Sequence, residues 1–221
     1  MPRPKSGYRL KNGTKATGVT TITGRYKDAS GLLWWAFDQG KAAERGEINS
    51  LYDKRDEAGD AGTLAHALVE ARIHGSEPPV VDLANPAHVQ ASTGFQNYLE
   101  WHQNNRIVIV EQELELVSET YRFGGSPDAI GVDNQDRFCL LDWKTSKAVY
   151  PEYLVQLAAY KALIEEATDY RITGGFHLLR FSKENADFSH HYWTELDDAW
   201  ELFLLYKQAY ELDKKLKKRT G

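Results

Sequence analysis

The stretch Gly124–Lys147 constrains the fold of this chain most, because turn residues and short apolar runs alternate along it. It opens with GGSP, which predicts a turn, and the apolar residues 129–132 predict a strand that begins just after Asp128. A second apolar run, residues 138–141, leads directly into Asp142. Two neighbouring strands of this kind would form a sheet in which the two carboxylates converge.

Asp142 is followed by Trp143 and Lys144. Because side chains alternate across a strand, Asp142 and Lys144 should share one face, with Trp143 on the other. Two aspartates can hold Mg²⁺, a hard ion that takes oxygen ligands, and still leave positions open for a phosphate and a water. A lysine beside them would orient the attacking water or help deprotonate it, and would offset the charge of the transition state. The pattern therefore indicates metal-dependent cleavage of phosphodiester bonds.

The short pattern has a structural alternative. An acidic residue two positions before a lysine should occur by chance roughly once or twice in a chain of this size. A second copy is present at Asp213-Lys214-Lys215, in what reads as a polar, basic helix end. For Asp142 and Lys144 taken alone, an ion pair at a strand end is an equally good interpretation.

A helix over residues 151–167 is predicted by Pro151, which suits a first helical turn, and by the apolar stripe that follows. Gln156 and Tyr160 lie four residues apart, so their side chains should share one face. A glutamine and a phenol at the edge of a metal centre would suit contacts to a phosphate or a base. Core packing is the alternative for Tyr160.

Together these residues resemble the motifs of the PD-(D/E)xK nuclease superfamily, in its RecB-like exonuclease branch of phage or prophage type. The similar segments are GGSPD around Asp128, LLDWKTS around Asp142, and QLAAY from Gln156 to Tyr160. Upstream, GTLAH at residues 62–66 is similar to the GT-x-x-H helix of that branch. The resemblance implies an α/β fold with a restriction-endonuclease-like core, in which helices flank a central mixed β-sheet.

The resemblance also implies a metal site that would hold Mg²⁺ or Mn²⁺. His66, Asp128 and Asp142 would bind the metal, aided by the carbonyl of Trp143. His66 has a structural alternative, because a lone histidine among apolar helix residues is usually a hydrogen-bonded core residue. Glu70, one turn beyond His66, could support that site, although an exposed helix charge is the simpler interpretation.

The remaining roles follow from the same resemblance. Lys144 would position the water, and Gln156 and Tyr160 would hold the substrate strand. Glu113 lies where a motif glutamate precedes the turn, and would assist directly or through water. Glu113 also alternates with the glutamates two positions before and after it, as on a solvated strand face.

The chain has enough apolar material for one nuclease domain, at 221 residues and 42% hydrophobic content. We expect an N-terminal helical and basic extension over residues 1–60, a catalytic core over 62–195, and a C-terminal helix with a basic end over 196–221. Loops are expected at 46–61 and 75–85. The remaining predicted elements are helices near 31–45, 62–74, 85–103 and from 197, and strands near 106–117, 122–132, 136–143, 175–181 and 188–193.

Charge is distributed unevenly along the chain, whose net charge is -5. Residues 1–27 hold seven basic and no acidic side chains, and residues 214–219 hold five more basic ones. The body between them is strongly acidic, which is a mild objection to a DNA-binding protein. The basic ends could supply phosphate contacts, or the C-terminal cations could simply stabilise the helix dipole.

Only Cys139 is present, so the chain cannot by itself bind the four-cysteine iron-sulfur cluster of some RecB-like relatives. Its position in a strand predicts a buried, small hydrophobic residue. No disulfide framework, secretion signal or membrane span is predicted, which favours a soluble protein of the cytoplasm, or of the host cytoplasm if a phage encodes it.

Aromatic pairs offer a weaker indication of substrate. Trp34-Trp35, Tyr121 and Phe123 are candidates for stacking on unpaired bases, because one member of each pair should face away from the core. Neighbouring His190 and His191 should point to opposite faces of a strand, which argues against a shared metal.

The resemblance therefore implies an exonuclease acting on linear DNA with free ends, in phage or bacterial recombination, repair or replication. A single-strand annealing protein or a helicase would be its partner. The alternatives are a non-catalytic DNA-binding or scaffold relative, and a nuclease subunit that is active only with a helicase or recombinase.

Overall fold

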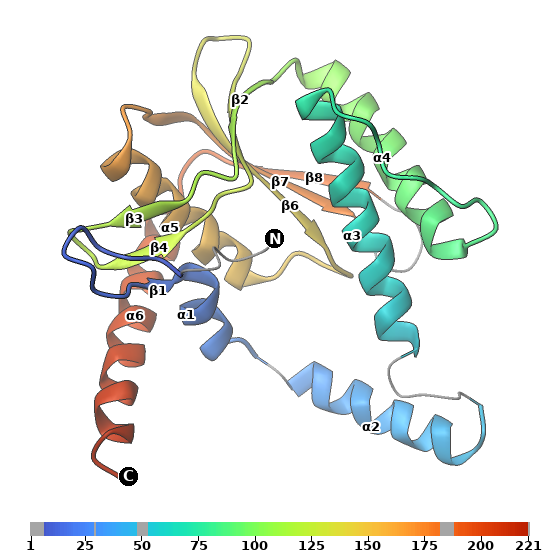
Figure 1. The fold of residues 1–221 in the computed structure, drawn as a ribbon, viewed down its shortest axis with the longest axis horizontal. Coiled ribbons are helices and arrows are strands. Elements are labelled where there is room, and N and C mark those ends of the chain that lie inside the picture. The colour runs from blue at the N-terminus through green and yellow to red at the C-terminus, as the bar shows by residue number, and fades with distance from the viewer. Residues whose placement is uncertain (1–6, 29, 48–52, 182–187, 221) are drawn as a thin grey trace.

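A computed structural model describes residues 7–28, 30–47, 53–181 and 188–220. Within these ranges only the backbone is described for Leu32, residues 53–60 and His66. A twisted sheet lies at the centre, with helices on both of its faces (Figure 1).

The central sheet is mixed, as expected. Strands β6 and β7 run parallel, and every other neighbouring pair is antiparallel. The order across the sheet is β2 (Val108–Gln112), β5 (Ala129–Val132), β6 (Phe138–Thr145), β7 (Ile172–Phe181) and β8 (Phe188–Trp193). Since β5 and β6 are antiparallel, the start of β5 and the end of β6 meet at the same edge of the sheet.

A smaller sheet lies beside the central one. Strand β4 (Phe123–Gly125) is its middle strand, with β1 (Thr17–Gly18) parallel on one side and β3 (Leu116–Ser118) antiparallel on the other. The N-terminal segment is thereby attached to the turn that leads into β5.

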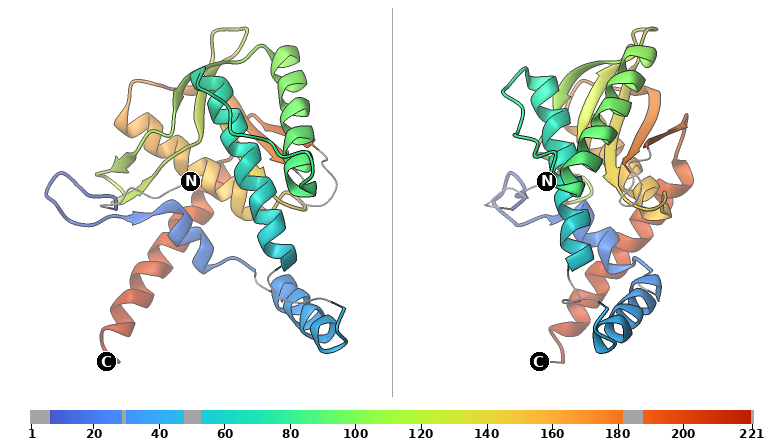
Figure 2. Two further views of the ribbon diagram at one scale, coloured as in Figure 1. Left: turned by 45° about the vertical axis from the view of Figure 1, so that its right-hand side comes forward. Right: turned by 90° about the vertical axis from the view of Figure 1, so that its right-hand side faces the viewer.

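The helices form layers on the two faces of the central sheet (Figures 1 and 2). Helices α3 (Asp53–His74) and α4 (Pro86–Asn105) cover one face. Helices α5 (Pro151–Ala167), α1 (Val19–Arg25) and α6 (Asp197–Lys217) lie on the other side. Helix α2 (Ser30–Glu44) connects α1 with α3 and extends away from the sheet.

The alternation of side chains along β6 divides the core in two. Leu140 packs with the cluster under α5, whereas Leu141 and Trp143 pack with the cluster under α3 and α4. Asp142 and Lys144 therefore lie on the α5 side, as the two-residue period predicted. Cys139 is fully buried, as expected, and burial raises the pKa of its thiol to about 12.

Three predicted element boundaries were wrong. The strand expected over 106–117 ends at Gln112, because Glu113 adopts a left-handed conformation with φ of 50°. The glutamates around Glu113 therefore do not alternate on one strand face. The strand expected over 122–132 is divided between β4 and β5, where Pro127 has no N–H for a sheet hydrogen bond. The loop expected over 46–61 is helical from Asp53 onward.

Other elements agree with the sequence. Asn85 caps α4 through a hydrogen bond that its side chain accepts from the Ala87 N–H at 2.9 Å. Trp34 is 70% exposed and Tyr121 is 38% exposed, so one member of each aromatic pair faces away from the core as expected. Phe123 is fully buried and is therefore not available to stack on a base. No helix among the described residues is long and apolar enough to cross a membrane.

Candidate active site

The two aspartates and the lysine come together where β5 begins and β6 ends. Asp128 directly precedes β5, and Asp142 and Lys144 lie near the end of β6. Asp142 is fully buried and Asp128 is 4% exposed. The Nζ of Lys144 lies 2.6 Å from Oδ2 of Asp142. This arrangement is consistent with the prediction from sequence that the three groups converge.

The backbone fixes the orientation of Asp128. Its Oδ2 accepts a hydrogen bond of 2.8 Å from the N–H of Trp143, between Asp142 and Lys144. Burial raises the pKa of the Asp128 carboxyl, although the charge of Lys144 and this hydrogen bond oppose the increase. Burial lowers the pKa of Lys144, but the charges of Asp142 and Asp128 outweigh it, so the pKa lies above its ordinary value. Lys144 is thus an ammonium at neutral pH.

Phenol rings surround this group on the α5 side. Tyr160 is 4% exposed. Its pKa lies well above the ordinary value, because burial and the charges of Asp142 and Asp128 disfavour a phenolate. The Nζ of Lys144 lies 5.6 Å from the centre of the Tyr153 ring. Tyr160 therefore contributes a neutral hydroxyl close to both aspartates.

Glu113 lies next to Asp128 because of its unusual backbone. Its left-handed conformation, which costs on the order of 1 kcal/mol or more for a residue other than glycine, directs its N–H to the Asp128 carbonyl at 3.1 Å. The charge of Glu113 contributes to the raised pKa of Asp128. The turn that ends β2 thus places Glu113 beside Asp128.

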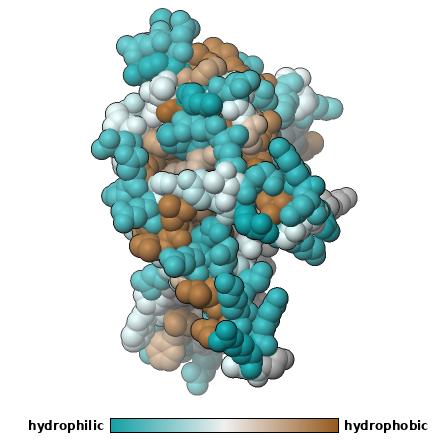
Figure 3. All heavy atoms as spheres, turned by 90° about the vertical axis from the view of Figure 1, so that its left-hand side faces the viewer, coloured by the Kyte–Doolittle hydropathy of each residue, from teal (hydrophilic) through white to brown (hydrophobic). Residues whose placement is uncertain are grey.

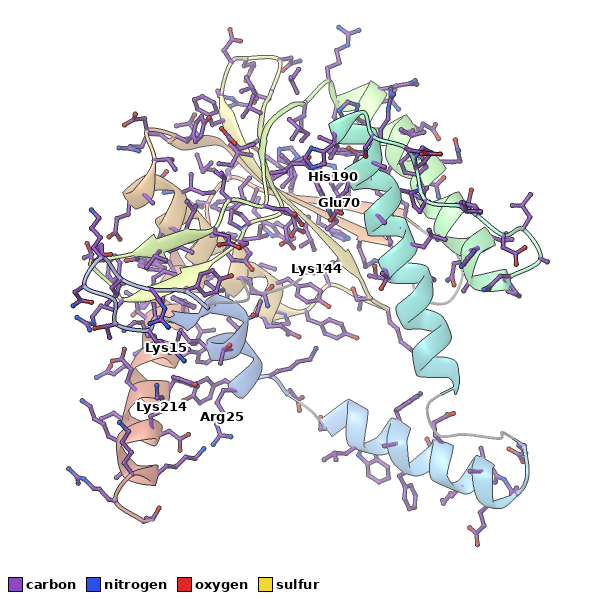
Figure 4. All side chains as sticks on the ribbon, in the orientation of Figure 1. Lys15, Arg25, Glu70, Lys144, His190 and Lys214 are labelled. Carbon is purple, nitrogen blue, oxygen red and sulfur yellow. The ribbon has the colours of Figure 1, made fainter. Side chains whose placement is uncertain are left out.

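Glu70 is a further acidic residue close to Glu113. Burial, followed by the charge of Glu113 and a side-chain hydrogen bond with it, raises the pKa of the Glu70 carboxyl. Figure 4 shows Glu70 on α3 and Lys144 on β6, both near the centre of the molecule. The prediction that Glu70 is simply an exposed charge on a helix is therefore wrong. Its position one turn after His66 was the only sequence signal.

The structure gives no contact to the aspartates for one predicted residue and a different partner for another, within the described side chains. His66 lies on α3, but its side chain is outside the described residues. The side chain of Gln156 donates a hydrogen bond of 3.3 Å to Thr23 on α1. Gln156 shares the α5 face with Tyr160, yet in this conformation it contacts the N-terminal helix.

The paired histidines belong to another part of the sheet. His190 is hydrogen-bonded to His177, with 2.9 Å between Nε2 and Nδ1, whereas His191 contacts Ser189. His190 and His191 thus have separate partners.

The chemistry of the donors suits a hard divalent cation. Asp128, Asp142 and Glu113 offer carboxylate oxygens, the ligand type that Mg²⁺ and Mn²⁺ prefer. In the part of the chain with described side chains, no three His, Cys, Asp or Glu residues are grouped as a complete metal site. The Lys144 ammonium contacts Asp142, so a bound cation would share this carboxylate with the lysine.

A mixed sheet with buried carboxylates and a lysine at one edge is the arrangement that the resemblance to nucleases implied. A model of the PD-(D/E)XK nuclease superfamily matches residues 35–215 of this chain. The chain therefore belongs to the PD-(D/E)XK nuclease superfamily. Enzymes of this superfamily generally use divalent metal ions.

The solved structures that this chain matches are only distantly similar to it. A protein from Eubacterium rectale with the provisional description of an exonuclease is 13% identical, with a TM-score of 0.43 over 67% of this chain and 68% of its own. The alkaline exonuclease LHK-Exo from Laribacter hongkongensis is 12% identical, with a TM-score of 0.33 over 74% of this chain and 92% of its own. A comparison with curated proteins found no match.

Proposed function

We propose that this nuclease is a metal-dependent exonuclease that hydrolyses phosphodiester bonds of linear DNA. The observation that carries this proposal is the arrangement of Asp128, Asp142 and Lys144 at one edge of the sheet. The two carboxylates are buried, and the lysine contacts one of them directly. A buried ion pair of this kind is costly to form as a structural feature alone, which supports a role in chemistry.

Lys144 would act as a cation. Of the two roles that its position allows, we favour orientation of the water, because its Nζ already contacts Oδ2 of Asp142 at 2.6 Å as a donor. The ammonium would also offset the negative charge that develops on the phosphate in the transition state.

Asp128, Asp142 and His66, with the main-chain carbonyl of Trp143, would hold Mg²⁺ or Mn²⁺. The ion would supply Lewis-acid polarisation of a phosphoryl oxygen and lower the pKa of a bound water. Glu113 would assist from beside Asp128, and Glu70, which interacts with Glu113, would position it.

Tyr160 and Gln156 would contact the substrate strand. The Tyr160 hydroxyl stays neutral and can donate a hydrogen bond to a phosphate oxygen. Gln156 would exchange Thr23 for the substrate, since its amide can donate to either. Because Tyr160 is buried and close to both aspartates, we favour a contact with the scissile phosphate over a contact with a base.

We infer a role in phage or bacterial DNA recombination, repair or replication in the cytoplasm, with a single-strand annealing protein or helicase as a partner. A non-catalytic DNA-binding relative and a subunit that needs its partner for activity remain the competing hypotheses. Activity of the purified chain would support the proposal. Activity that appears only when a partner is added would support the subunit, and inactivity in both conditions would support the non-catalytic relative.

The first test is degradation of end-labelled linear DNA and covalently closed DNA, single- and double-stranded, with Mg²⁺, Mn²⁺ or EDTA. Lys144→Ala should lower the rate by roughly a hundredfold or more, because it removes a charge that stabilises the transition state. Lys161→Ala is the control. Lys161 pairs with Glu165 on the same helix, so this variant should retain activity.

Loss of linear DNA alone, with metal present, would establish the exonuclease. Activity that persists in Lys144→Ala would contradict the proposed mechanism. Cleavage of covalently closed DNA would contradict the exonuclease assignment. Because Lys144→Ala leaves Asp142 buried without its partner, it should also destabilise the fold. The double variant Asp142→Asn, Lys144→Met removes both charges, should fold better, and should still be inactive.

A further inference from the structure

One arginine of the basic N-terminal region lies against the basic C-terminal helix. Arg25 at the end of α1 donates to Asp213 of α6 at 3.1 Å, and Lys217 contacts the same carboxylate at 3.1 Å. Tyr26 and Tyr206 stack beside this contact, with 4.9 Å between their ring centres. Figure 4 shows Arg25 and Lys214 close together on adjacent helices.

Folding therefore builds one positively charged surface from distant parts of the chain. We name it the terminal basic surface. Its members are Arg25, Lys214, Lys217, Lys218 and Arg219, all of them exposed. Asp213 lies among these five cations and is engaged by two of them. Figure 3 shows the corresponding side of the molecule, where hydrophilic side chains crowd the projecting part of α6 around smaller hydrophobic areas.

Helix α1, which carries Arg25, and the segment that precedes it contact the region of the candidate active site. Thr23, two residues before Arg25 on α1, accepts the hydrogen bond from Gln156. The hydroxyl of Tyr8 lies 3.2 Å from Oγ of Ser126, in the turn that leads to Asp128. Helix α1 thus connects the substrate face of α5 with the terminal basic surface.

We propose that the terminal basic surface binds the phosphodiester backbone of the DNA beyond the cleavage site. This inference rests on the proposed function. Exposed lysines and arginines spread over two helices suit a long polyanion, whereas a small anion would need converging groups in an enclosed pocket. The contacts would be independent of base sequence, and they explain how a chain with an acidic body retains DNA.

A simpler role for the lysines is to stabilise the C-terminal end of α6 through the helix dipole. The two roles make different predictions. A dipole effect would appear in the stability of α6 and leave DNA affinity unchanged, whereas phosphate contacts would appear in DNA affinity and in its dependence on salt.

The test is the triple variant Lys214→Gln, Lys218→Gln, Arg219→Gln. It spares Arg25 and Lys217, whose contacts with Asp213 join α1 to α6. The matched control, Arg106→Gln, Arg137→Gln, Arg171→Gln, removes the same charge. These three arginines precede β2, β6 and β7, at the sheet edge opposite to Lys144.

Binding to fluorescent 30-mers, single- and double-stranded, would be measured in EDTA at several salt concentrations. We expect the triple variant to bind roughly tenfold or more weakly at low salt, and its log-log salt slope to fall by about 2 to 3 on duplex. The control should keep the wild-type slope. The terminal basic surface binds whichever form of DNA, single- or double-stranded, shows the larger loss of affinity.

Equal affinities of the triple variant and the control for both strand forms would overturn the inference. The proposed function is tested separately, by cleavage of a short oligonucleotide that cannot reach the terminal basic surface. If wild type cleaves nothing, the proposed function fails. If wild type cleaves and the triple variant binds 30-mers as the control does, only this inference fails.

Discussion

At the scale of single residues, two adjacent glycines allow aromatic rings to approach the turn before Asp128 from both sides. A Cβ atom on Gly124 would lie 2.5 Å from Cβ of Tyr8, and one on Gly125 would lie 2.8 Å from Cε1 of Tyr160. Neither ring could keep its position beside a larger residue. The glycines therefore serve close packing around the candidate site.

Gly125→Ala should destabilise the protein by about 1–3 kcal/mol, because the added methyl group overpacks a core that contains Tyr160 and Leu163. Urea unfolding would measure the loss. Gly24→Ala is the control, since that position on α1 has no atom within 4 Å of an added Cβ. Equal stabilities of the two variants would show that the turn can relax around the methyl group.

Single residues of the site were partly accessible from sequence. Asp128, Asp142 and Lys144 could be placed together because the rules that apply are local: a turn followed by strands with a two-residue period. The contact of Tyr8 with Ser126 could not be predicted, because 118 residues separate them. Glu70 was misjudged for a similar reason, since its partner Glu113 lies on another element.

At the scale of elements, strands β7 and β8 are joined by a histidine pair that should make the fold sensitive to acid. His177 is buried against His190. Burial, and then the charge of His190, lowers the pKa of His177 to about 4. The folded protein thus binds this proton less readily than the unfolded chain, whose histidine has a pKa near 6.5.

The contribution of His177 to the free energy of unfolding should therefore be fully present above about pH 6.5. It should decrease as the pH is lowered toward 4, and below that pH it should decrease no further. For this histidine the loss should reach about 2–3 kcal/mol between pH 7.5 and 4.5. His177→Phe should reduce the difference in urea-unfolding free energy between these pH values by about that amount. The same difference in wild type and variant would assign the acid sensitivity to other groups.

The limits of prediction at this scale lie in backbone turns. Periodicity indicated one strand through Glu113, but the left-handed conformation of that residue ends β2 and turns the chain toward β3. No local preference of glutamate favours that conformation, so tertiary contacts must stabilise it. Helices with clear starts, such as the one capped by Asn85, were predicted closely.

At the scale of the whole molecule, a divalent cation should stabilise the fold. A ligand that binds only the folded state at about a hundred times its Kd adds about 2.7 kcal/mol of stability. Mg²⁺ or Mn²⁺ should therefore raise the Tm of wild type, and EDTA should reverse the increase. Asp142→Asn should lose the response, whereas Asp133→Asn should keep it, because Asp133 lies in a distant turn bonded to Arg137.

A Tm of wild type that does not change when metal is added would contradict the proposed metal site, independently of any activity.

The charge pattern of the chain could be predicted only in part at this scale. Its basic ends were evident in sequence, but the ion pairs of Arg25 and Lys217 with Asp213 depend on how α1 and α6 pack.

The hydrogen bond from the Trp143 N–H to Asp128 has a consequence for how sequences of this kind diverge. The group that orients the aspartate belongs to the main chain, and every amino acid except proline supplies it. The Trp143 side chain packs on the opposite side of the sheet, with Tyr98 of α4. The residue between Asp142 and Lys144 is therefore free to vary with the hydrophobic packing, and related chains should carry any residue there except proline.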